Sequence, residues 1–196
     1  MTTEKGWPNR LVAWGPNDAA VCGQAIMERI NCPRSRDFAG PSGDPLVMIE
    51  PIPAKDGSWI LDVRATAASG EGRFAVRIPV PGHPIPDRIT DSLRAYGRMR
   101  ARTAADPARW NTDNVRTVYP PLEGATFVGR DGTVWIGLHE TERGNPWLIL
   151  NPDGSLYGRL TVPTNVKVTM GERSRFWGSE YDENDIQSVV RFRITR

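Results

Sequence analysis

Cysteine and histidine are both scarce in this chain of 196 residues, which has two of each. Cys22 and Cys32 form no Cys-x-x-Cys pair, and His83 and His139 lie far from them, so no zinc site is expected. The two cysteines are either a disulfide that closes a short loop or two small buried thiols, and the sequence favours neither.

Long apolar runs and strong charge are also missing. No run approaches the roughly 18 apolar residues that a membrane helix needs, and residues 1–10 lack the apolar core of a signal peptide. We therefore predict no membrane partner and assign no localisation. The net charge of +2 and the pI near 8.7 are too mild to predict nucleic acid as a partner.

The common catalytic signatures do not occur either. There is no Gly-x-Ser-x-Gly elbow and no phosphate-binding loop, and residues 139–143 lack the second His of a zinc-protease helix. Residues 182–185 form an acidic turn without the Gly or final Glu of an EF-hand, so a solvated hairpin tip is preferred over a Ca²⁺ loop. No catalytic residue and no cofactor is predicted, with Ca²⁺ as the only alternative. The weak binding candidates are His139, Glu140, Glu142, Asp182 and Asp185.

Glycine and proline, by contrast, are plentiful, at 19 and 17 residues, which favours many strands and turns over helices. The chain also has seven Trp. We expect these to fill the core, because large aromatic side chains are mostly buried; the alternative is a stacking surface for sugars. In particular, Trp135 and Trp147 are predicted to be core residues of neighbouring strands.

The clearest pattern lies in residues 131–163. Asp131-Gly132 predicts a tight turn, and residues 133–138 then read as a strand buried on both faces. Further strands are predicted at 147–150 and 156–162, which makes an antiparallel meander. The segment 55–63 resembles 130–138, and 72–79 resembles 154–163. Such repetition is typical of propeller blades.

The remaining strands and loops follow from shorter signals. A loop is expected at 32–44, a strand at 10–14, and a strand or short helix at 19–30. Four prolines in residues 79–86 are expected to end the preceding sheet. Further strands are predicted at 46–49, 59–64, 74–78, 166–170, 175–181 and 188–194. Together the predictions amount to about twelve strands, which is about three four-stranded blades.

One helix is predicted, over about residues 87–105. Its apolar side chains recur at helical spacing from Ile89 to Met99, Asp87 or Thr90 is expected to cap it, and Asp106-Pro107 ends it. Its arginines are interpreted as a solvated face that lies away from an apolar stripe, not as a nucleic-acid reader, because no aromatic residues are interleaved with them.

From about residue 74 to the end, the order of these elements resembles the C-terminal part of bacterial six-bladed β-propeller proteins, often described as lipoproteins. The shared features are a Pro-rich strand end at 78–85, an Arg-rich helix, a Pro-Pro lead-in, Asp-Gly turns before Trp strands, and a last hairpin at 177–194. Those proteins are longer and exported. The resemblance therefore implies a partial propeller, a fragment of a longer reading frame, or a half-ring that pairs with a second copy.

Taken together, these observations predict a mainly β, partial β-propeller of about three four-stranded antiparallel blades with one inserted helix. The expected organisation is one domain: a lead-in (1–50), a blade (51–86), a helical insertion (87–110) and C-terminal blades (111–196). The function predicted is a non-catalytic binding or scaffold module. The alternative is a carbohydrate- or lactone-directed hydrolase or lyase that uses acidic loop residues or Ca²⁺. Expected partners are a second copy of the chain or missing blades.

Overall fold

The computed structural model describes residues 36–103, 117–122, 125–184 and 186–195. Their regular structure is mainly β, as predicted: four antiparallel sheets of two to four strands accompany one helix. The predictions for residues 10–14 and 19–30 and for both cysteines lie outside the described residues. The elements are β1 (Arg36–Ala39), β2 (Leu46–Pro53), β3 (Trp59–Thr66), β4 (Gly72–Val80), β5 (His83–Pro84), α3 (Asp87–Ala101), β6 (Val118–Tyr119), β7 (Thr126–Val128), β8 (Val134–Gly137), β9 (Asn145–Leu150), β10 (Leu156–Val162), β11 (Val166–Glu172), β12 (Arg175–Tyr181) and β13 (Gln187–Arg193).

The chain divides into two compact units. The described part of one unit consists of residues 84–103 and 117–119, which include α3 and β6. The other unit holds the three larger sheets, in residues 36–83 and from 120 onward. The short strand β5 lies at the border between the two units in sequence, and it pairs with β6.

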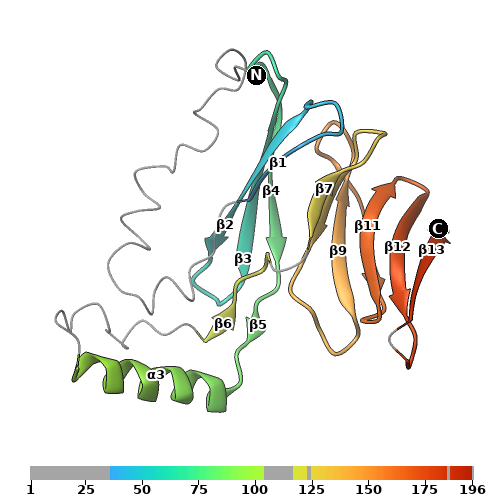
Figure 1. Cartoon of the computed structure of the whole chain (residues 1–196). Coiled ribbons are helices and arrows are strands. Elements are labelled where there is room, and N and C mark those ends of the chain that lie inside the picture. The colour runs from blue at the N-terminus through green and yellow to red at the C-terminus, as the bar shows by residue number, and fades with distance from the viewer. Residues whose placement is uncertain (1–35, 104–116, 123–124, 185, 196) are drawn as a thin grey trace, which may run out of the picture. The chain divides into compact units, whose positions relative to one another are not determined.

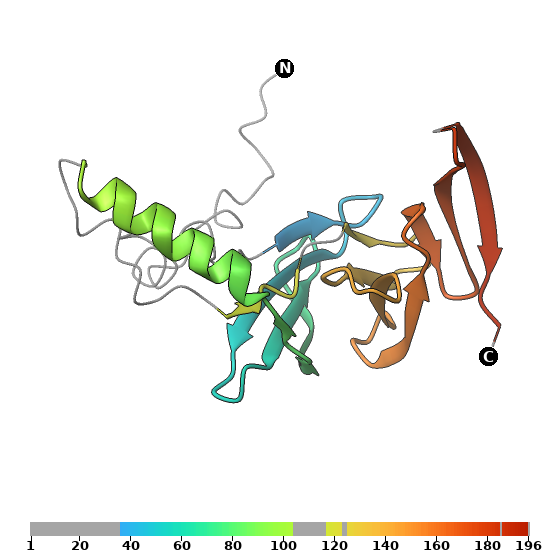
Figure 2. The same cartoon turned by 90° about the horizontal axis from the view of Figure 1, so that it is seen from below.

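Within the larger unit, each sheet is an antiparallel meander whose strands pair in sequence order (Figure 1). The first sheet consists of β1 to β4, the second of β7 to β10, and the third of β11 to β13. The second sheet contains the predicted meander, together with β7, which was not predicted. The third sheet has three strands in the described chain, not the four of the expected blade. Figure 2 shows the second sheet between the other two.

One turn motif recurs at three hairpins, at Asp56-Gly57-Ser58, Asp131-Gly132-Thr133 and Asp153-Gly154-Ser155. In each, the Gly has a positive φ, of 81°, 78° or 83°, which a residue without Cβ adopts at little cost. The Asp Oδ1 accepts the hydroxyl of the following Ser or Thr at 2.6 Å in all three turns. Local turn chemistry therefore determines these hairpins, and Asp-Gly signals in the sequence predict all three turns.

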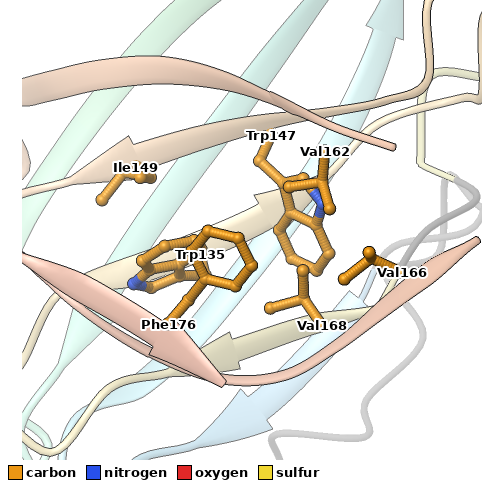
Figure 3. Packing of buried hydrophobic residues seen from close by; sticks show 7 residues of the cluster. All are labelled: Trp135, Trp147, Ile149, Val162, Val166, Val168 and Phe176. Atoms are coloured by element: carbon orange, nitrogen blue, oxygen red, sulfur yellow. The ribbon is translucent and has the colours of Figure 1, made fainter. Parts of the chain in front are cut away.

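The second sheet is buried on both faces, as predicted for residues 133–138. All four residues of β8 are buried, and so are the last four of β9. On one face, Trp135, Trp147 and Ile149 pack with Val162 and with residues of the third sheet (Figure 3). Because side chains alternate along a strand, their neighbours point to the opposite face, toward the first sheet.

Two contacts show that the first sheet lies against this opposite face. The turn at Gly154 is so close to Phe74 of β4 that a Cβ there would come within 2.5 Å of the ring. Arg159 of β10 also donates a hydrogen bond of 3.4 Å to the carbonyl of Pro79. The two tryptophans predicted to be core residues are confirmed, with exposed fractions of 0% for Trp135 and 5% for Trp147.

Two predictions about strand ends were wrong, both involving proline. β4 continues through Pro79 to Val80, and β2 continues beyond Ile49 through Pro51 to Pro53. The reason is position in the sheet. β4 is an edge strand of the described sheet, and Ile49 pairs with Arg36, the first described residue of β1, so among the described residues each proline lies where its strand has no partner on one side. β1 is a short strand within the predicted loop at 32–44.

The predicted helix is confirmed at Asp87–Ala101, but two of its details differ. Pro86 occupies the N-cap and no side chain caps the first turn, whereas Thr90 donates its hydroxyl to the Asp87 carbonyl at 2.8 Å. The expected apolar stripe is also incomplete. Tyr96 and Met99 are 44% and 54% exposed, and the buried positions of the helix are Thr90 and Gly97.

Candidate functional site

Three of the five predicted binding residues lie in the connection between β8 and β9. The backbone N–H of His139 donates to the carbonyl of Pro121 at 2.8 Å, and the pair Thr141 and Gly144 closes a tight loop with two hydrogen bonds of 2.9 Å. Gly144 has a φ of 122°, and a Cβ there would come within 2.4 Å of the Val162 carbonyl oxygen. Glu140 and Glu142 are exposed on this connection, and His139 is half-buried.

The predicted acidic turn caps a hairpin. Asp182 is exposed at the tip between β12 and β13, where its Oδ1 accepts the backbone N–H groups of Asn184 and Ile186, both at 2.9 Å. This carboxylate therefore already holds a turn. Asp185, the fifth candidate, is outside the described residues.

The described acidic candidates do not gather around one point. In residues 36–103, 117–122, 125–184 and 186–195, no three His, Cys, Asp or Glu side chains form a cluster that could hold a metal ion. The prediction that loop carboxylates are ligands therefore gains no geometric support, and it remains a prediction.

The structure instead brings His139 to a residue that sequence reasoning had passed over. The ring centroids of His83 and His139 are 5.8 Å apart, with their planes tilted by 44°. His83 follows β4 of the first sheet, and His139 follows β8 of the second. Both side chains are half-buried. No spacing pattern relates these two positions, so only the packing of the two sheets could reveal the pair.

A cleft of about 270 Å³ opens between the second and third sheets. Trp147, Leu138, Val166 and Val168 contribute apolar surface, and the indole of Trp147 also belongs to the core cluster in Figure 3. The rest of the lining is small or polar: Ala125, Gly137, Asn145, Thr164 and Lys167. The pocket is small and chemically mixed. Trp147 is its aromatic residue, and Asn145, Thr164 and Lys167 supply an amide, a hydroxyl and an amine.

Asp131, in the turn between β7 and β8, also connects the second sheet to the third. Its Oδ2 accepts the backbone N–H of Arg173, in the turn after β11, at 2.7 Å. Burial by itself would raise the pKa of this carboxyl, but hydrogen bonds from Thr133 and from the Arg173 N–H outweigh it, so the pKa lies below 3.8. Asp131 thus joins a turn of the second sheet to a turn of the third in its charged form.

A second carboxylate, Asp62 of β3, is buried among arginines that were not singled out from sequence. Arg64 donates to it through two nitrogens, at 3.1 and 2.9 Å, and Arg77 lies 3.5 Å away. The hydrogen bonds from Arg64 outweigh burial and lower the pKa of Asp62. The charges compensate one another, so we regard this cluster as structural.

Comparison with known proteins adds no identity to these features. No family model matches the chain, and no curated protein resembles it significantly. No helix in the described residues is long and apolar enough to cross a membrane.

Proposed function

We propose that the chain is a non-catalytic binding or scaffold module of β-propeller type. The observation that carries this proposal is the succession of three sequential meanders, of four, four and three strands, that stack face to face. Propeller blades are built in this way, around a common axis. Further support comes from β1 and β7, the first strands of two successive sheets, which lie in contact.

The cleft beside Trp147 is where such a module would bind a ligand. A volume of about 270 Å³ is slightly below the size of typical small-molecule sites, so it suits a single sugar ring or one side chain of a partner. An apolar part of the ligand would contact the small part of the Trp147 side chain that borders the cleft, and Asn145, Thr164 and Lys167 would supply hydrogen bonds. This combination is how carbohydrate rings, which have one apolar and several polar faces, are usually held.

The proposal is tested by titrating the full chain with mono- and oligosaccharides and short peptides while recording the indole N–H resonances of its seven Trp. The Trp147 signal, assigned with Trp147→Phe, should move saturably with at least one probe class. Ala125→Trp, which fills the cleft from an exposed position, should abolish this shift, and Arg94→Gln on α3 should not. If no probe shifts Trp147 at millimolar concentration, or if Ala125→Trp has no effect, the cleft is not a binding site.

The alternative, a carbohydrate- or lactone-directed hydrolase or lyase, is not favoured by any particular observation. It requires loop carboxylates that converge, and Glu140, Glu142 and Asp182 form no metal-binding cluster in the described chain. It remains a sequence-based hypothesis. The same titration would reveal it if a bound saccharide were consumed.

A further inference from the structure

His83 and His139 are the only two histidines in the chain, and the fold brings their rings together. A centroid separation of 5.8 Å lies within the range for stacked aromatic rings, but the 44° tilt corresponds to neither a parallel nor an edge-on arrangement. Stacking alone would also be served better by Phe or Tyr. The chemical property that distinguishes two imidazoles is their ring nitrogens.

The separation fits two imidazoles that share one metal ion. Imidazole nitrogens bind Zn²⁺ at about 2.0–2.1 Å, which places each ring centroid about 3.2 Å from the metal. At a tetrahedral angle the two centroids would then be about 5.2 Å apart, and at wider angles almost 6 Å. The observed 5.8 Å lies between these two values.

The backbone on both sides of the pair is held in place. His139 is fixed by its N–H bond of 2.8 Å to Pro121, and the next-but-one residue, Thr141, closes the tight loop with Gly144. His83 is the first residue of β5, which pairs with β6, and it lies three residues after the end of β4. A shared ion would consequently connect β5 to the segment that follows β8 of the second sheet.

We propose that His83 and His139 form a binding site for a divalent transition metal such as Zn²⁺, Cu²⁺ or Ni²⁺. Imidazole suits these ions, whereas Ca²⁺ and Mg²⁺ prefer oxygen ligands. No third His, Cys, Asp or Glu completes a cluster among the described residues, so water fills the remaining positions. The site is distinct from the cleft beside Trp147 and does not depend on the proposed function.

The test uses the tag-free full chain with Cys22→Ser and Cys32→Ser, so that no thiol competes for metal. Two histidines give only two sets of ring resonances in a long-range ¹H–¹⁵N spectrum, and ZnCl₂ should shift both together with one binding curve. His83→Phe and His139→Phe retain a ring at each position while removing its nitrogens, so they separate chelation from packing. Each variant should lower the Zn²⁺ affinity about tenfold or more, because two-point binding becomes one-point binding.

A second readout is thermal. ZnCl₂ or NiCl₂ should raise the Tm of the parent chain and CaCl₂ should not, and both Phe variants should lose the metal-dependent increase while keeping their metal-free Tm. The proposal is overturned if millimolar Zn²⁺ leaves either ring unshifted. It is equally overturned if a Phe variant that remains folded binds Zn²⁺ as tightly as the parent.

Discussion

Replacing Trp135 by alanine is expected to destabilise the protein by about 3–5 kcal/mol. The indole is fully buried and packs against Phe127, Trp147 and Phe176, with ring centroids 5.7, 6.0 and 6.1 Å away. Burial of an indole removes about 200 Å² from water, which at about 25 cal/mol per Å² contributes about 5 kcal/mol. Residual burial in the unfolded chain reduces this figure by about 10–40%.

The polar end of the indole adds little to this cost. Trp135 Nε1 donates to Thr133 Oγ1 at 3.1 Å, but the Thr133 hydroxyl itself donates to Asp131 at 2.6 Å. Truncation of Trp135 therefore removes a donor without leaving a buried donor unsatisfied. Urea denaturation followed by circular dichroism measures the loss. Trp177→Ala is the matched control, because Trp177 is only half-buried beneath Arg175, and it should cost clearly less.

A double-mutant cycle with Gly171 tests whether the stability lost in Trp135→Ala comes from the packing of the indole against β11. A Cβ at Gly171 would come within 2.2 Å of Trp135 Cε2, so Gly171→Ala should cost about 1–3 kcal/mol in the parent chain. In the Trp135→Ala background the methyl group would enter the vacated space, and most of that cost should disappear. A loss below about 1 kcal/mol for Trp135→Ala, or strictly additive effects, would refute the packing described for Figure 3.

Three further predictions follow from other elements. Folding lowers the pKa of Asp131, so the stabilisation from its charge is present above the unfolded value of 3.8 and is lost as the pH falls through the folded pKa. The difference in unfolding free energy between the parent and Asp131→Asn, measured by urea denaturation, should therefore become smaller below about pH 4. Replacement of Arg94, Arg98 and Arg102 by Gln should leave the Tm within a few degrees, since the Arg94–Asp91 pair is a surface contact, and micromolar duplex-DNA binding that this variant lost would contradict the solvated-face interpretation. Light scattering after size exclusion at micromolar concentration should give about twice the 21.8 kDa chain mass, and a monomer would contradict the homodimer prediction.

Predictions from sequence were most accurate where local chemistry determines structure. Asp-Gly turns and apolar runs identified the hairpins of the second sheet and the two buried tryptophans. The strands that the sequence did not predict, β1, β5, β6 and β7, have two to four residues each and carry too little pattern to distinguish them from loops. The strand ends at Pro53 of β2 and Val80 of β4 depend on which side of a strand is unpaired, and no local sequence signal indicates that.

The candidate site was less predictable, because it depends on contacts between sheets. His139 was singled out together with its acidic neighbours, Glu140 and Glu142, yet the ring that it meets is that of His83, from a different sheet. Asp182 was singled out as acidic, and its carboxylate caps a turn. Composition can suggest residues for a site, but the assembly of the sheets determines which of them meet.

The last strand also changes how a second copy could associate. Val190, Phe192 and Ile194 pack against the buried cluster around Trp135 and therefore leave no open apolar face on that side. The side of β13 that faces away carries Arg191, Arg193 and Val189, and Val189 is 86% exposed. A broad apolar face of the kind that stacks blades in a ring is therefore not available there. Among the described residues β13 is the edge strand of its sheet, so its outer backbone groups are available for pairing.

An edge-to-edge dimer would suit the charges of the β12–β13 hairpin. Its open end carries Arg191 and Arg193, and its tip carries Asp182 and Glu183. Antiparallel pairing of two β13 strands across a twofold axis would direct the basic end of each chain toward the acidic tip of the other. The same arginines oppose parallel or out-of-register pairing, since like charges would then be aligned. Association through β13 would consequently extend the third sheet with a second copy, whereas face-to-face stacking would have to bury those arginines.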